Sequence, residues 1–144
     1  MIHLHCWTHE GIVFIPTVVW IKGGGSIDID PVAVVSISDR PELTDALDRA
    51  LIRPIAIMPP LPRDDARPNP VFKYTRAKSW GAFERKETPW SISKHEGVYT
   101  IVAWRKARGE GHLYDENRCQ KLPTDASPKE AVRRLIEILE GQAD

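Results

Sequence analysis

The sequence of 144 residues has the length of one domain, with 42% hydrophobic and 28% charged residues, as in an ordinary globular protein. Lysine plus arginine and aspartate plus glutamate number 20 each, and this zero net charge argues against a dedicated nucleic-acid or membrane-surface binder. Its two cysteines are too few for a disulfide framework, and we recognise neither a secretory signal nor a membrane-spanning run. We therefore expect a soluble, cytoplasmic protein.

The first part of the chain predicts strands. Residues 2–7 and 12–21 are rich in Ile, Val and Trp, with a turn at Gly11 between them. The glycine triplet at 23–25 lacks the neighbouring residues of a phosphate-binding loop, so we interpret it as a hairpin turn. Residues 26–30 alternate polar with apolar, and 33–37 form another short apolar stretch.

A helix is expected over residues 41–52. Asp39 is a suitable N-cap, Glu42 follows three residues later, and apolar residues then recur at helical spacing. Six prolines between residues 54 and 70 predict a rigid connector, with at most a short edge strand at 55–58.

Residues 71–76 are typical of a strand with basic side chains on one face. Basic and aromatic residues continue to alternate as far as Lys86, a pattern that could also clamp single-stranded nucleic acid. The residues concerned are Lys73, Arg76, Lys78, Arg85 and Lys86, with Tyr74, Trp80 and Phe83. We favour a sheet with a charged outer face, and the nucleic-acid binder remains an alternative.

The last third predicts a hairpin and a helix. Residues 90–94 and 98–105 flank a turn at Gly97, and short strands at 112–114 and 119–122 would extend the same sheet. Ser127 is an expected N-cap, and Gly141 an expected C-terminal cap of the closing helix. The fold class is therefore α+β: a mainly antiparallel twisted sheet with about two helices on it, in a single domain over residues 1–144.

Three histidines near the start raise the question of a metal. Alternation along a strand would place His3 and His5 on one face, and His9 could fold back from the turn. Zinc needs a third or fourth ligand and supporting hydrogen bonds; His95, His112 and Asp28 are candidates, but no spacing demands them. A small metal-dependent hydrolase or nuclease using these histidines is thus the alternative function. We favour a half-exposed strand without metal, cofactor or catalytic residues.

Neither cysteine is an evident nucleophile. Cys6 would share the apolar face of the first strand with Ile2 and Leu4, which predicts an unreactive thiol with a raised pKa. Cys119 lies between Arg118 and Lys121, but no partner base stands near it in the sequence.

Residues 98–141, under a third of the chain, resemble a bacterial family. The matching pattern is a strand ending in Trp104-Arg105, a gap with glycines, Leu122-Pro123, a polar linker, and Ser127 before an amphipathic helix. It is similar to the immunity proteins of contact-dependent growth inhibition (CDI) systems. The first half of the chain, with its glycine triplet and histidine-rich start, departs from anything we can match.

The resemblance implies a cytoplasmic inhibitor. Such proteins bind the C-terminal toxin domain of a delivered surface protein, usually a nuclease, as a 1:1 complex. They need no catalytic residue, cofactor, nucleic acid or membrane. The matched residues Trp104, Leu122, Pro123 and Ser127 are expected to be structural, so the toxin-binding surface has to come from elsewhere.

Charge suggests a place for that surface. Residues 1–48 contain two basic and seven acidic residues, a net charge of −5, so residues 49–144 carry +5. Carboxylates placed over the basic groove of a nuclease would speed association and cover the groove. The candidate toxin-binding residues are Asp28, Asp30, Asp39, Glu42, Asp45, Asp48 and Trp20. Solvated surface charge is the plainer interpretation of the same residues.

Overall fold

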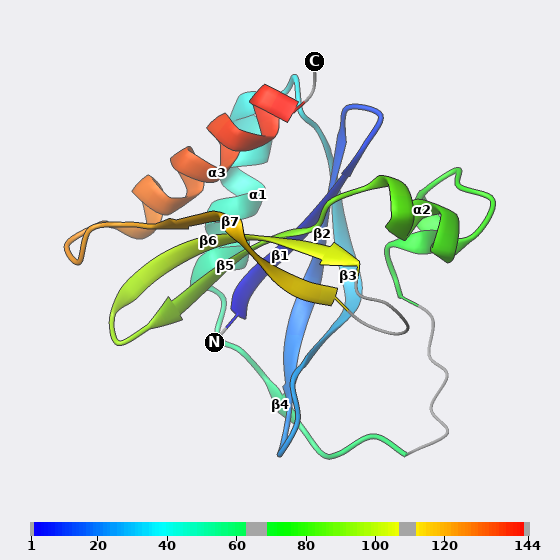
Figure 1. The fold of residues 1–144 in the computed structure, drawn as a ribbon, viewed down its shortest axis with the longest axis horizontal. Coiled ribbons are helices and arrows are strands. Elements are labelled where there is room, and N and C mark those ends of the chain that lie inside the picture. Colours follow the sequence, from blue (N-terminus) through cyan, green and yellow to red (C-terminus); the bar gives the residue numbers. More distant parts are fainter. Residues whose placement is uncertain (1, 63–68, 107–111, 143–144) are drawn as a thin grey trace.

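A twisted sheet forms the centre of the molecule (Figure 1). The computed structural model describes residues 2–62, 69–106 and 112–142. The main strands are β1 (Ile2–His9), β2 (Ile12–Ile21), β3 (Ser26–Ser36), β5 (Trp90–His95), β6 (Val98–Lys106) and β7 (His112–Lys121). They lie in the order β3-β2-β1-β5-β6-β7, each antiparallel to its neighbours. The two-residue β4 (Ile57–Met58) runs parallel to the end of β2.

Two tight turns set the register of neighbouring strands. The turns are Glu10-Gly11, with φ of 48° and 77°, and Glu96-Gly97, with φ of 50° and 80°. Positive φ at both central residues matches the twist of the flanking strands, and glycine adopts it without strain. The predicted hairpins at Gly11 and Gly97 are confirmed.

Two helices cover one face of the sheet. α1 (Arg40–Ile52) and α3 (Pro128–Gln142) lie side by side there, as Figure 1 shows. Their buried side chains recur at helical spacing and pack against Leu4, Cys6 and Ile101 of the sheet. Each fully buried leucine on these helices contributes about 1.5–3 kcal/mol of hydrophobic stabilisation. The α+β fold class is confirmed.

Both helices begin where the sequence predicts. Asp39 accepts a hydrogen bond from the Glu42 amide at 3.2 Å, and Ser127 accepts one from the Glu130 amide at 3.2 Å. The expected cap at Gly141 is wrong, because α3 continues to Gln142. The side-chain oxygen of Gln142 accepts the indole N–H of Trp90 at 3.2 Å, and this contact fastens the last turn of the helix to the sheet.

The opposite face is covered by a different segment. Here the predicted strand at 71–76 is wrong: the chain forms the 3-10 turn η1 (Phe72–Tyr74) and then the short helix α2 (Trp80–Lys86). The Asn69 side chain accepts the Val71 amide at 2.9 Å and starts the turn. Val71 and Phe83 are buried there with Trp7 and Phe14 of the sheet.

Two strands are longer than predicted. β3 joins the two stretches expected at 26–30 and 33–37 and ends at Ser36; at Pro31 its register with β2 shifts, and Thr17 Oγ1 donates to the Pro31 carbonyl at 2.8 Å. β7 likewise joins the two short stretches expected at 112–114 and 119–122. Of the proline-rich connector, residues 63–68 lie outside the described residues, and β4 is the expected edge strand.

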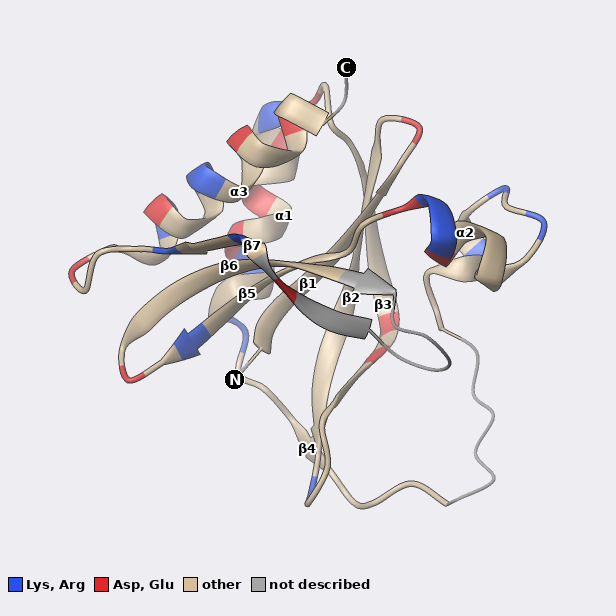
Figure 2. Ribbon diagram, in the orientation of Figure 1, with Lys and Arg blue, Asp and Glu red and all other residues tan. Residues whose placement is uncertain are grey.

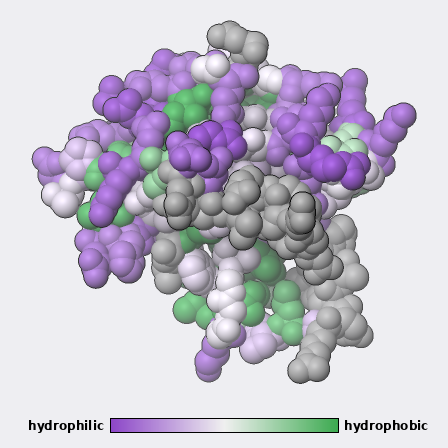
Figure 3. All heavy atoms as spheres, viewed as in Figure 1, coloured by the Kyte–Doolittle hydropathy of each residue, from purple (hydrophilic) through white to green (hydrophobic). Residues whose placement is uncertain are grey.

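Charge and hydropathy divide the surface. Charged residues of both signs mark α1, α3 and α2 and also occur on β3, β5 and β7, whereas β1 and β2 contain none (Figure 2). In Figure 3, hydrophobic residues gather in the lower part of the view, around the ends of β2, β3 and β4, where Ile57 is 71% exposed. None of the helices in the described part of the chain is both long and apolar enough to cross a membrane.

Candidate functional site

The face of the sheet opposite α1 and α3 contains a hollow of about 790 Å³. It lies between the sheet, the end of the connector, η1 and α2. Its lining is rich in aromatic side chains and includes two carboxylates, and no lysine or arginine is found among the described residues that line it. The aromatic side chains are those of Trp7, Phe72, Trp80 and Trp104, and the carboxylates are those of Asp28 and Glu84.

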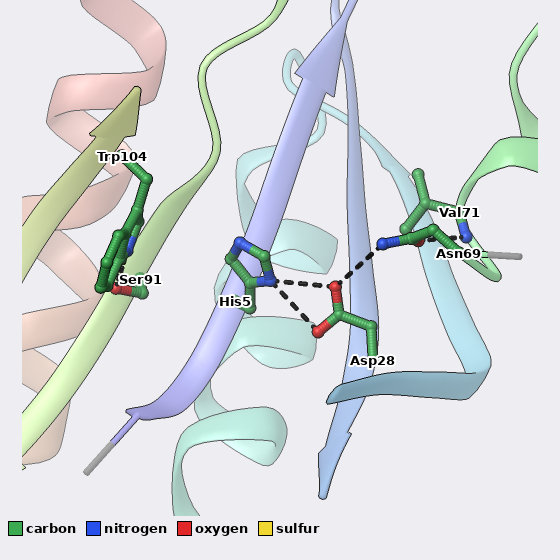
Figure 4. Close-up of polar contacts among 6 residues, drawn as sticks. All are labelled: His5, Asp28, Asn69, Val71, Ser91 and Trp104. Atoms are coloured by element: carbon green, nitrogen blue, oxygen red, sulfur yellow. Dashed lines mark hydrogen bonds and ion pairs between the residues drawn. The ribbon is translucent and has the colours of Figure 1, made fainter. Parts of the chain in front are cut away.

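One wall of the hollow holds a linked set of polar side chains (Figure 4). Nδ1 of His5 lies 3.1 Å and 3.0 Å from the two carboxylate oxygens of Asp28. The Asn69 side-chain amide donates to the same carboxylate at 3.3 Å. Because Asn69 also accepts the Val71 amide, the set ties β1 and β3 to the segment that begins η1.

Asp28 is held ionised by these partners. Its side chain is only 10% exposed, and burial by itself raises the pKa of a carboxyl group. The charge of His5 and hydrogen bonds from His5, Asn69 and Trp7 outweigh burial and leave the pKa of Asp28 below its ordinary value. The hollow therefore contains a carboxylate that stays charged at neutral pH.

The aromatic side chains form a packed wall. Trp7 meets the edge of Trp80, with ring centroids 5.0 Å apart, and Trp80 stacks on Phe83 at 5.1 Å. Trp104 donates its indole N–H to Ser91 at 2.7 Å, beside the hollow (Figure 4). These contacts fix ring positions, so the hollow has a shape set before anything binds.

A second histidine–carboxylate pair holds α2 in place. Nδ1 of His9 lies 2.8 Å from a carboxylate oxygen of Glu87, which is the residue after α2. The His9 ring also packs against Phe83 at 5.3 Å. α2 is thereby fastened to the end of β1, and this keeps Trp80 at the rim of the hollow.

The structure separates the three histidines considered as metal ligands. A register shift between Ile2 and Leu4 puts His3 beside Ala50 and Arg53, on the α1 side of the sheet. His5 and His9 lie on the other side, each paired with a different carboxylate. Among residues 2–62, 69–106 and 112–142, no three His, Cys, Asp or Glu side chains gather closely enough to hold a metal ion.

The predicted burial of Cys6 beside Leu4 is confirmed, whereas Ile2, expected on the same face, lines the hollow on the other side of the sheet. The Cys6 side chain is fully buried in the core, and this burial raises the pKa of the thiol to about 12. A thiol in that state is neither a nucleophile nor a metal ligand near neutral pH. Cys119 is half-buried on β7 and is not part of the hollow.

The acidic candidates do not form one surface. Asp28 lines the hollow. The exposed Asp30, nearby on β3, accepts a hydrogen bond from the Lys73 ammonium at 2.7 Å. Asp39, Glu42, Asp45 and Asp48 belong to the cap or body of α1, on the opposite face. Sequence proximity had grouped two sets of carboxylates that the sheet keeps apart.

Local contacts moderate several of these charges. Asp45 pairs with Arg49 at 3.0 Å, and Asp48 shares a small groove with Arg40, Lys129 and Arg133 between α1 and α3. Trp20, the proposed aromatic anchor, is half-buried and donates its indole N–H to the Ile2 carbonyl at 3.2 Å. It is not one of the side chains that line the hollow.

The basic and aromatic residues between 73 and 86 also separate. Phe83 is buried against the sheet and Trp80 faces the hollow, whereas Arg76, Lys78, Arg85 and Lys86 are exposed. The alternation therefore reflects one inward and one outward side of a turn and a helix. It does not form the row of exposed rings on which successive bases would stack.

Sequence reasoning missed the hollow itself. Asn69, Phe72 and Glu84 carry no recognisable signal: Asn69 falls in the predicted connector, Phe72 in the strand predicted over residues 71–76, and Glu84 beyond that strand. The signal that was present is the alternation of His5, Trp7 and His9 on β1, which marks a polar and aromatic face on a strand whose other face is apolar.

Comparisons with known proteins provide information about the fold alone. The structure is similar to a protein of unknown function, NMB0488, from Neisseria meningitidis, with a TM-score of 0.56 and 17% sequence identity. The match covers 98% of this chain and 94% of that one. No family model matches the chain, and no curated protein matches it. The shared property is thus the arrangement of the whole chain.

Proposed function

We propose that this protein is an immunity protein of a contact-dependent growth inhibition system. It acts in the cytoplasm of the producing cell, where it binds and neutralises the cognate C-terminal toxin domain as a 1:1 complex. The toxin domain is expected to be a nuclease. The resemblance in residues 98–141 carries this proposal.

The resembling residues occupy one structural unit, which supports the use of the pattern as a whole. Trp104 lies on β6 and donates to Ser91, Leu122 packs against the main core, and Ser127 caps α3. The pattern thus corresponds to a strand, its return and the helix that closes the core. The roles of Leu122 and Ser127 agree with the expectation that the matched residues are structural, whereas Trp104 also lines the hollow.

The hydrolase alternative loses its geometric basis. It required His3, His5 and His9 to converge on one metal ion, and His3 lies on the opposite side of the sheet from the other two. His5 and His9 are each engaged with a separate carboxylate. A binding function uses none of these contacts chemically and is compatible with all of them.

The exposed carboxylates at the start of α1 are the proposed steering surface. Asp39 and Glu42 lie close together at the start of α1. A hydrogen bond with Asp39 and the negative charge of Asp39 raise the pKa of Glu42. Asp45 continues this edge and is 65% exposed. Asp28 is excluded from this surface, because it is reached only through the hollow on the other face.

The first test is whether a gene for a large secreted toxin lies immediately upstream, and the second is co-expression of this protein with the C-terminal domain of that toxin. We expect restored growth and a 1:1 complex in size-exclusion chromatography with light scattering. Glu42→Lys and Asp45→Lys, each made alone, should slow association at low salt, whereas Glu137→Lys makes the same charge change on the neighbouring helix α3 and serves as the control. Failure to bind or protect, or substrate turnover by the protein alone, would overturn the proposal.

A further inference from the structure

We propose that the hollow is a receptor for a guanidinium group, and that the arginine side chain it accepts is presented by the partner protein. This inference rests on the proposed function, because it names how the partner would be gripped. The carboxylates of α1 lie on the opposite face and would act on the partner's approach through long-range attraction. Four observations lead to it: the aromatic wall, the ionised carboxylate, the absence of cationic lining among the described residues, and the size of the space.

The aromatic wall favours a planar cation. The half-buried rings of Phe72 and Trp80 line the hollow with their centroids 6.4 Å apart, and Trp7, which is only 1% exposed, packs against Trp80. Arginine stacks on such rings and is attracted by their negative faces, and it is more weakly hydrated than an ammonium ion. An aromatic wall therefore selects a guanidinium over a strongly hydrated cation.

The carboxylate supplies the charge. Asp28 is almost completely buried at the wall of the hollow, and its partners His5 and Asn69 approach it through single N–H groups. Among the described residues that line the hollow, His5 is the basic side chain beside this carboxylate, and no lysine or arginine accompanies it. Glu84 at the α2 side of the hollow adds a second carboxylate to the lining. A buried charge in such surroundings gains most from a cation that brings its own hydrogen-bond donors.

The volume and the lining of the hollow favour binding of an arginine side chain from a protein over binding of free arginine. A hollow of about 790 Å³ is open enough to admit the end of a chain segment, and its described lining has no lysine or arginine to receive an α-carboxylate. Free arginine carries an α-ammonium as well as that α-carboxylate, and the described lining offers the carboxylate no lysine or arginine to offset its lost hydration. An arginine within a polypeptide carries no such charge, so the lining fits a side chain presented by another protein.

The test uses the purified protein and small probes, so it does not depend on the toxin. The probe is arginine capped at both ends, N-acetyl-arginine amide, and its matched neutral control is N-acetyl-citrulline amide. Binding is followed by the indole N–H resonances, because Trp7, Trp80 and Trp104 line the hollow and Trp20 does not. We expect saturable shifts of the lining indoles with capped arginine, and roughly tenfold or more weaker binding of capped citrulline.

Two variants localise the effect. Asp28→Asn should weaken capped arginine roughly tenfold or more, whereas Asp45→Asn removes an equal charge from the α1 face and should change nothing. Trp80→Leu should also weaken binding, and Trp20→Leu is its control. Comparison of the two capped probes on the unaltered protein remains decisive if a variant fails to fold.

The outcomes separate the two proposals. Equal binding of capped citrulline, no binding of either probe, or an unaffected Asp28→Asn variant would overturn the guanidinium site, even if the protein still protects cells from its toxin. Tighter binding of free arginine than of capped arginine would also overturn it, in favour of a small-molecule site. Capped-arginine binding without toxin protection would instead retain the site and remove the immunity function.

Discussion

Replacement of Asp28 by asparagine is the sharpest test of the structure. The substitution removes the charge that His5 and Asn69 share, while it keeps the size of the side chain and one acceptor oxygen. Hydrogen bonds to a charged group contribute about 1.5–3 kcal/mol. Loss of one member of a fully buried pair costs about 3–5 kcal/mol, but His5 remains 20% exposed, so the lower range applies. We expect a loss of about 2 kcal/mol in the free energy of unfolding.

Urea denaturation followed by tryptophan fluorescence measures this loss, and a thermal shift of roughly 4–8 °C should accompany it. His5→Ala and the double variant complete a cycle whose coupling energy should be on the order of 1–2 kcal/mol. Asp45→Asn is the control, since its exposed pair with Arg49 contributes only about 0.3–0.5 kcal/mol. A coupling energy below about 0.5 kcal/mol would refute the reasoning.

The same carboxylate predicts a pH dependence. Because the pKa of Asp28 is lowered in the folded state, its stabilising contribution is complete above the unfolded value of about 3.9. That contribution is lost as the pH falls through the folded pKa. Stability of the unaltered protein should therefore decline more steeply at acid pH than that of Asp28→Asn, and parallel acid profiles would contradict the assignment.

Three further predictions test the other face of the sheet and its helices. Cys6 should resist thiol reagents in the folded protein and react at full rate in urea, while the half-buried Cys119 reacts first; equal rates would contradict the burial of Cys6. Leu135→Ala should lower the free energy of unfolding by about 2–5 kcal/mol, against little change for the exposed Arg134→Ala measured in the same urea series. Ser127→Ala should cost about 1 kcal/mol in that assay, because the Glu130 amide loses its acceptor, and Ser127→Asp should restore it.

Local signals predicted most of the fold. Glycine turns, alternating strands and two well-capped helices are determined by nearby residues, so β1, β2, α1 and α3 emerge with nearly correct bounds. The prediction for residues 71–86 failed because their structure depends on residues that are distant in the sequence. Val71 and Phe83 are apolar residues that would suit a strand, and they become a turn and a helix because Trp7 and Phe14 of the sheet receive them.

The candidate site was harder to predict for the same reason. Its members come from β1, β3, β6, η1 and α2, and no spacing in the sequence relates Asp28 to His5 or Asn69. The charge asymmetry of residues 1–48 was real but misleading. It combined the carboxylates of α1 with those of β3, and the sheet lies between the two sets.

Stability alone does not explain the pair of His5 and Asp28. A nearly buried ion pair is often no more stabilising than apolar residues of similar volume, because both groups lose their hydration. Replacing both residues, as His5→Leu with Asp28→Leu, should therefore leave the free energy of unfolding within about 1 kcal/mol of the original or raise it. The single variant Asp28→Leu should be clearly less stable, because His5 loses its partner. If the double variant keeps its stability and loses capped-arginine binding, the pair serves recognition. Retained binding together with a large loss of stability would assign it to the fold instead.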